Sequence, residues 1–256
     1  MPRRPGAIDL NADLGEGAGP DGAADGALLE VVTTAHVACG FHAGDPSVMA
    51  GTVRAAVAAG VVVGAHPSYP DRAGFGRRSM DRPPAVVADD LAYQLGALQG
   101  VARRAGGTVR SVKPHGALYH RVAGDEALAL AVAGVVREGG DALVLVLPAG
   151  APALAVASGA GVAVAAEAFC DRGYLADGSL APRGVPGALV TDPDEAGARA
   201  VALVTGRPLT ALDGTPLRLD CDTLCVHGDT PGSPGIARAV RRALAGAGIA
   251  VRPFAR

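Results

Sequence analysis

Val109-Arg110-Ser111-Val112-Lys113-Pro114-His115-Gly116 is a short apolar run that passes directly into polar residues and a glycine. An apolar run of this length, bounded by turn residues, favours a buried strand. Similar runs recur along the chain, at residues 7–10, 37–39, 61–64, 142–147, 162–166 and 224–226. The repetition predicts about seven short strands, most of them followed at once by polar residues.

Helical patterns separate these strands. Apolar residues at three- and four-residue spacing occur over Ala24 to Thr34, Pro46 to Ala59, Ala85 to Ala105, Asp125 to Arg137, Asp192 to Thr205 and Ser233 to Ala245. Asp45 and Asp192 each precede a proline and suit helix N-caps. Alternating strands and helices imply a parallel sheet, and its closure would bring all strand exits to one rim. We therefore predict an α/β fold, a single (β/α) barrel of about seven parallel strands over residues 1–256.

The residues that follow the strands are rich in side chains that bind ligands or transfer protons. They are Asn11, Asp13 and Glu16; His42 and Asp45; His66 and Asp71; Lys113 and His115; Glu167, Asp171 and Arg172; and His227 and Asp229. Lys113 is the only lysine beside 22 arginines. An ammonium is compact and titratable, whereas a guanidinium is neither. Lys113 is therefore predicted to be a site residue, and the competing interpretation is a solvated lysine on a turn.

Strand periodicity brings some of the polar groups to the same side of the sheet. A period of two puts Asp9, Asn11 and Asp13 of the first strand on one face, and it likewise pairs Lys113 with His115. Barrel interiors are usually filled by branched aliphatic side chains, so a polar interior needs hydrogen-bonded partners or a ligand. For Asp9 alone we expect a structural salt bridge.

Composition fits one globular domain. The chain has 256 residues, of which 49% are hydrophobic, and a net charge of −2 that offers no electrostatic footprint for nucleic acid. Residues 1–5 are basic but lead straight into a strand without a signal-peptide core. The stretch Ala151 to Ala166 contains glycines and is a poor membrane span. We expect a cytoplasmic protein without a membrane or nucleic-acid partner. The four cysteines lack paired spacing and are interpreted as core residues, with a nucleophile as the alternative for Cys170.

Two segments depart from the repeat. Residues 167–191 form a long glycine-rich segment that contains Arg183, and a loop of this length at a polar strand exit is typical of a functional rim loop. Residues 207–220 resemble an inserted hairpin around an Asp213-Gly214 turn, for which no catalytic role is predicted.

Nucleotide-binding motifs give little support for a phosphate loop. Residues 17–22 match the dinucleotide fingerprint in letters, but Asp21 would face the pyrophosphate and Pro20 removes an amide. A Walker A loop is excluded because its lysine precedes Ser or Thr, whereas Lys113 precedes proline. Any ATP must be held in another way or by another chain.

Six motifs in order along the chain resemble the LamB/YcsF family. They are Asp9-Leu10-Asn11-Ala12-Asp13-Leu14-Gly15-Glu16, Ala38-Cys39-Gly40-Phe41-His42-Ala43-Gly44-Asp45, Gly64-Ala65-His66-Pro67-Ser68-Tyr69-Pro70-Asp71, Val112-Lys113-Pro114-His115-Gly116, Phe169-Cys170-Asp171-Arg172-Gly173-Tyr174 and Val226-His227-Gly228-Asp229. The resemblance implies a barrel similar to glycoside hydrolase and polysaccharide deacetylase barrels. It also implies an ATP-hydrolysing 5-oxoprolinase activity that requires two partner subunits, B and C. A glycine-rich insertion around residues 18–22 departs from the pattern and leaves the motifs intact.

The implied reaction opens the lactam of 5-oxo-L-proline to L-glutamate, with ATP hydrolysed to ADP and phosphate. Such chemistry needs cations for phosphate, a base for water and an acid for the leaving nitrogen. On this resemblance Lys113, with Arg172 or Arg183, would bind phosphate or the substrate carboxylate. Asp13 or Glu16 would be the base, and His115 or His227 the acid. Asp229 joins these catalytic candidates, and the remaining expected substrate contacts are Asn11, His42, Asp45, His66, Glu167 and Asp171.

A different function class is a metal-dependent amide or ester hydrolase that acts alone. Asp13, His42 and His66 come from three successive strand exits and have suitable ligand types for a divalent metal. For either histidine, the competing interpretation is a ring hydrogen-bonded to a loop carbonyl. A non-catalytic regulatory protein is a third class, and so dense a polar rim argues against it.

Overall fold

The protein is a parallel barrel of seven strands. The computed structural model describes residues 6–17, 23–140, 142–230 and 232–255. The barrel strands are β1 (Ala7–Leu14), β2 (Thr34–Ala38), β3 (Val62–His66), β4 (Val109–Val112), β5 (Val144–Pro148), β6 (Ala163–Phe169) and β9 (Thr223–Cys225). Each pairs with the next, and β9 pairs in parallel with both β6 and β1, which closes the barrel. The predicted fold class is thereby confirmed. A further short strand, β10 (Ala250–Val251), lies parallel to the start of β1.

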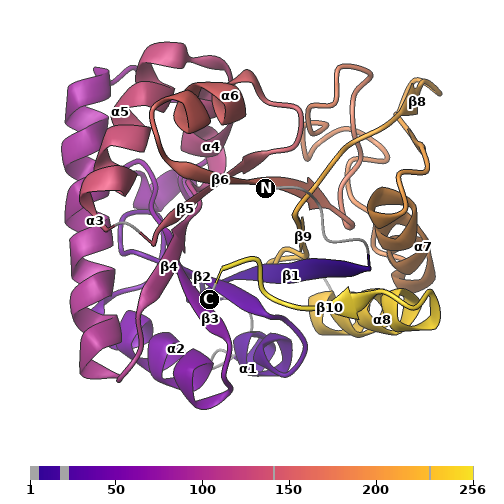
Figure 1. Ribbon diagram of the computed structural model, residues 1–256, viewed down its shortest axis with the longest axis horizontal. Helices are drawn as coiled ribbons and strands as arrows, with labels where there is room; N and C mark the ends of the chain where they lie inside the picture. Colours follow the sequence, from indigo (N-terminus) through magenta and orange to yellow (C-terminus); the bar gives the residue numbers. More distant parts are fainter. Residues whose placement is uncertain (1–5, 18–22, 141, 231, 256) are drawn as a thin grey trace.

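Helices surround the strands (Figure 1). They are α1 (Ala23–Leu29), α2 (Pro46–Ala58), α3 (Pro84–Arg104), α4 (Gly116–Gly124), α5 (Glu126–Glu138), α6 (Pro152–Gly159), α7 (Pro193–Val204) and α8 (Ser233–Gly246). The carboxylates of Asp45 and Asp192 accept backbone N–H groups at the starts of α2 and α7, as predicted. The sequence patterns did not predict α4 and α6. Both are short, and α6 lies in an alanine-rich stretch whose polar residues mark no helical face.

The apolar core lies between the barrel and its helices. Buried aliphatic residues from both layers form one continuous cluster, which includes Leu10, Val37, Leu91 and Leu145. Among the described residues, no helix is long and apolar enough to span a bilayer.

The interior of the barrel is polar, and β1 shows how its layers are built. Asp9 accepts hydrogen bonds from the hydroxyls of Thr33, Thr34 and Thr223. The salt bridge expected for Asp9 is therefore wrong, because hydroxyl donors satisfy its carboxylate without a cation. Burial raises the pKa of Asp9 to about 6. The next two inward residues of β1 are Asn11 and Asp13, which lie closer to the carboxyl end of the barrel.

Two irregular segments complete the rim. The segment between β6 and α7 folds back on itself through bridges between Arg172 and Leu189 and between Tyr174 and Leu180. Short antiparallel strands β7 (Leu209–Thr210) and β8 (Pro216–Leu217) make a hairpin. The glycine-rich residues 18–22, which carry the dinucleotide-like letters and the family insertion, lie outside the described residues.

Candidate active site

The carboxyl ends of the strands open into a pocket of about 550 Å³, within the range of small-molecule sites. Its lining includes most of the predicted site residues: Asp13, Glu16, His66, Lys113, His115, Arg172, Arg183, His227 and Asp229. The strand exits therefore do converge on one rim.

Lys113 lies in the barrel interior, at the floor of this pocket. Its Nζ is 2.8 Å from Asp13 Oδ1 and 2.8 Å from Glu167 Oε1, and it donates to Asn11 Oδ1 at 3.2 Å. Only 2% of Lys113 is exposed. Burial opposes the charged amine, but the Asp13 carboxylate and other neighbours raise the pKa of Lys113 well above its usual value. Lys113 is thus a buried ammonium compensated by two carboxylates, and the solvated-turn interpretation is wrong.

Side chains that the sequence patterns did not single out complete this layer. His36 on β2 contacts Asn11 Oδ1 through Nδ1 and Ser111 Oγ through Nε2, at 3.2 and 3.1 Å. Burial lowers the pKa of His36 well below its usual value, so the ring is neutral. Tyr119 donates its hydroxyl to Glu167 Oε2 at 2.7 Å. His36 lies within a strand and Tyr119 within a helix, where period-based reasoning assigns core packing.

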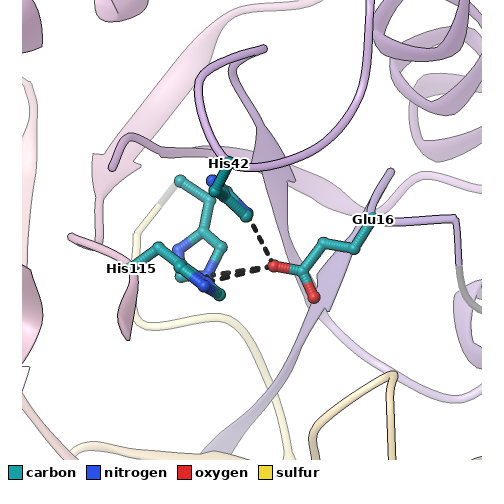
Figure 2. Close-up of side chains that lie close together, drawn as sticks. Glu16, His42 and His115 are labelled. Atoms are coloured by element: carbon teal, nitrogen blue, oxygen red, sulfur yellow. Dashed lines mark hydrogen bonds and ion pairs between the residues drawn. The ribbon is translucent and has the colours of Figure 1, made fainter. Parts of the chain in front are cut away.

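Three imidazoles converge on one carboxylate above Lys113. Glu16 Oε1 is 2.8 Å from His42 Nε2, 3.1 Å from His115 Nδ1 and 3.7 Å from His66 Nε2. The rings of His42 and His115 are stacked with centroids 3.7 Å apart, and both face Glu16 (Figure 2). Burial would raise the pKa of Glu16, but the neighbouring His115 and His42 lower it below its usual value. Burial lowers the pKa of His42 to about 4.

Backbone carbonyls fix the proton positions on two of these rings. His66 Nδ1 lies 2.7 Å from the carbonyl of Lys113, and His115 Nε2 lies 2.9 Å from that of Phe75. A carbonyl only accepts, so both nitrogens carry the hydrogen. In the neutral rings, His66 Nε2 and His115 Nδ1 are therefore unprotonated, and they face each other at 3.0 Å. Two opposed lone pairs beside a carboxylate require a cation, either a proton or a metal ion.

The donor set fits a divalent metal. Glu16, His42, His66 and His115 offer ligand atoms that all lie within 4.8 Å of one another. Imidazole nitrogen and carboxylate oxygen are common ligands for transition metals, and hydrogen bonds from the far ring nitrogens to carbonyls are the usual second layer of such sites. The predicted ligand Asp13 belongs to a neighbouring group with Cys225 and His227. Its Oδ2 is 3.4 Å from His66 Nε2.

Asp171 and His227 form a dyad next to Asp13. The buried Asp171 carboxylate lies 3.0 Å from His227 Nδ1 and accepts the His227 backbone N–H and the Thr230 hydroxyl. Burial alone would raise the pKa of Asp171, but His227 holds it below its usual value. The carboxylate orients the imidazole and leaves Nε2 for proton exchange with a ligand, as in acid–base dyads of hydrolases.

Asp45 and Arg172, both predicted substrate contacts, have partners in the protein. Asp45 caps α2 and does not line the pocket. Arg172 borders the pocket, but its guanidinium donates to the carbonyls of Ala181 and Ala188 and so organises the rim loop. Cys170 is fully buried, and burial raises the pKa of its thiol well above the usual value, which supports the core interpretation.

A parallel barrel with ionisable side chains gathered at the carboxyl ends of its strands is the architecture on which TIM-like barrel enzymes build their sites. The chain belongs to the LamB/YcsF family, whose model matches residues 8–256. It is 54% identical over 249 residues to the A component of the 5-oxoprolinase of Streptomyces griseus, covering 97% of this chain and 100% of that protein.

Two solved structures extend the comparison. The lactam utilization protein from Thermus thermophilus is 45% identical, with a TM-score of 0.89 and coverage of 97% of this chain and 100% of that one. A T48 deacetylase, 13% identical, has a TM-score of 0.50 over 96% of this chain and 87% of that one. The second likeness concerns the fold alone, and it agrees with the predicted similarity to deacetylase barrels.

Proposed function

We propose that this chain is the A component of a 5-oxoprolinase, which hydrolyses 5-oxo-L-proline to L-glutamate with conversion of ATP to ADP and phosphate, together with partner subunits B and C. The family and the names of its relatives support the substrate and the division into subunits. The observation that carries a catalytic role for this chain is the pocket floor itself. Two groups meet there. One is the histidine–carboxylate group, which needs a cation, and the other is the oriented Asp171–His227 dyad.

The lowered pKa values redistribute the acid and base roles expected from the sequence. Asp13 and Glu16 are both held ionised, and a carboxylate with a lowered pKa is a weak base. His227 is the better proton carrier because the Asp171 carboxylate fixes its tautomer through Nδ1. It would accept a proton from the attacking water and deliver one to the lactam nitrogen as the ring opens.

Glu16, His42, His66 and His115 would hold a divalent ion. When bound, such an ion supplies Lewis-acid polarisation of a substrate oxygen. Asp13 lies between Lys113 and His66. Its carboxylate would compensate the Lys113 ammonium and orient the His66 ring. Lys113 would act through Asp13 and Glu167 rather than by direct contact with phosphate, because its ammonium is already compensated.

The sequence has no Walker A loop, so ATP would be held by a partner subunit or in another way. The test measures 5-oxoproline-dependent ADP release by the purified chain, alone and with subunits B and C. We expect little or no coupled activity from the single chain and full activity from the complex. Full ATP-coupled activity of the single chain would refute the proposed division.

The metal-ligand set also favours a second candidate, a metal-dependent amide hydrolase that acts alone. This function predicts ATP-independent release of L-glutamate from 5-oxo-L-proline, or hydrolysis of other amides, by the isolated metal-loaded chain. Absence of such turnover from a chain that restores activity to the complex would eliminate it.

A further inference from the structure

Four cationic side chains line the described part of the pocket: Arg77, Lys113, Arg172 and Arg183. Two of them are committed to the protein. Lys113 is compensated by two carboxylates, and Arg172 donates to backbone carbonyls. Among these four side chains, Arg77 and Arg183 are left for an anionic group that enters the pocket.

These two arginines share one carboxylate at the mouth of the pocket. Arg77 Nη2 pairs with Asp229 Oδ2, and Arg183 Nη2 is 3.2 Å from Asp229 Oδ1. Each guanidinium has five N–H donors. Within the described residues, Asp229 is the only hydrogen-bond acceptor for either of them. The cluster consequently has unused donors and one positive charge more than its single carboxylate balances.

The nearby residue Phe75 holds Arg77 in place. Phe75 adopts a left-handed backbone with φ of 54°, which is costly for a residue other than glycine. Its carbonyl accepts from His115, and its ring lies under the Arg77 guanidinium at 4.8 Å. The same short segment therefore fixes a histidine of the pocket floor and an arginine of its mouth.

We propose that Arg77 and Arg183, drawn together by Asp229, bind the carboxylate of the lactam substrate. The inference rests on the proposed function and assigns the specificity-determining residues of its site. Arginine forks suit the two oxygens of a carboxylate.

The position of the Asp171–His227 dyad supports binding of the substrate carboxylate by these arginines. Asp229 follows His227 by two residues, so the carboxylate that pairs with both arginines belongs to the same strand exit as the proton carrier. In 5-oxoproline the carboxylate is attached to the carbon beside the ring nitrogen. A substrate carboxylate bound by Arg77 and Arg183 would therefore place that nitrogen, the leaving group of ring opening, on the side of His227.

The shared ligand chemistry is a small oxyanion, and a phosphoryl group is the other possible source. The experiment measures steady-state kinetics of the complete complex with Arg77→Gln, Arg183→Gln and Arg77→Lys chains, varying 5-oxo-L-proline and ATP separately. Arg54→Gln, on the exposed face of α2, is the matched control. The neutral analogue 5-oxo-L-prolinamide is tested as a competitive inhibitor of each complex.

We expect each Gln variant to raise KM for 5-oxoproline about 10- to 100-fold, the scale of one lost hydrogen bond to a charged group. KM for ATP and the inhibition constant of the amide should stay within about twofold, as uniform binding of the carboxylate implies. Arg77→Lys keeps the positive charge but not the two parallel N–H donors of the guanidinium. Its KM for 5-oxoproline should lie between the wild-type value and that of Arg77→Gln. The Arg54→Gln complex should match wild type.

A rise in KM for ATP instead would assign the arginines to a phosphoryl group and overturn the proposal. Unchanged KM for 5-oxoproline, or an equal loss of affinity for the amide, would overturn it as well. A wild-type complex without 5-oxoproline-dependent ADP release would refute the proposed function instead, so the two failures are distinguishable.

Discussion

Replacing Lys113 by methionine should destabilise the whole barrel. Methionine approximates the length and volume of lysine but removes the ammonium. Asp13 and Glu167, which are 5% and 1% exposed, would then face each other across the interior without a cation. Removal of one partner from a buried ion pair costs about 3–5 kcal/mol, because the remaining charge stays desolvated.

The expected loss is large enough to measure by heat or denaturant. For a domain of this size each kcal/mol corresponds to about 2–4 °C in Tm, so Lys113→Met should lower Tm by about 6–20 °C. Thermal unfolding followed by circular dichroism, with urea unfolding for the free energy, gives both numbers. The matched control is Arg54→Met on the exposed face of α2, which should change stability by less than about 0.5 kcal/mol.

A second substitution isolates the cause. Glu167→Gln in the Lys113→Met background removes one of the uncompensated charges and should recover part of the lost stability. A Lys113→Met protein that melts within about 2 °C of wild type, or a double variant less stable than Lys113→Met, would show that the network does not hold the interior together. Both sequence interpretations of Lys113, a site residue at a strand exit and a solvated lysine on a turn, imply the opposite, namely little influence on Tm. Its burial overturns that expectation, and Lys113→Arg should also destabilise because a longer planar group must fit the same closed space.

Three further outcomes are expected. Elemental analysis should find about one divalent ion per wild-type chain after dialysis and none in the His42→Ala/His66→Ala protein; wild-type chain without metal would argue that a proton occupies the cluster. Asp171→Asn should lower kcat of the complete complex about 10³- to 10⁴-fold with little change in KM, because His227 loses its tautomer control; a loss under tenfold would exclude the dyad from proton transfer. Gly76→Ala should cost at least about 1–3 kcal/mol, because φ is +65° and the added Cβ would lie 2.3 Å from Ser68 Oγ; unchanged urea unfolding would contradict this packing.

The sequence predicts the barrel well because its signals are local. Each of the seven strands overlaps an apolar run, most of these runs end in polar residues, and Asp45 and Asp192 mark helix starts by side-chain chemistry. Strand limits are less well predicted. β1 extends through Asp13 to Leu14 because its inward polar residues find partners inside the barrel, which an apolar run does not reveal.

The site is predicted as a set of residues but not as a set of contacts. Strand exits show that His66, His115 and Glu16 share a rim, yet only the structure shows which atoms meet. Arg77 gave no signal, because it lies on a loop among other arginines. Asp45 was misassigned because a helix-capping aspartate and a ligand-binding aspartate look alike in sequence.

Charge balance connects the interior of the barrel with the histidine cluster. Asp13, Glu16 and Glu167 are buried together, and Lys113 is the one lysine among them. Two carboxylate charges are left, and burying them uncompensated would cost several kcal/mol each. The unprotonated nitrogens of His66 and His115 lie where a cation would relieve this excess. A proton on His66 supplies one charge, and the Asp13 carboxylate raises the pKa of that ring against the opposing effect of burial. A divalent ion would supply both charges at once, and the elemental analysis proposed above distinguishes it from a proton.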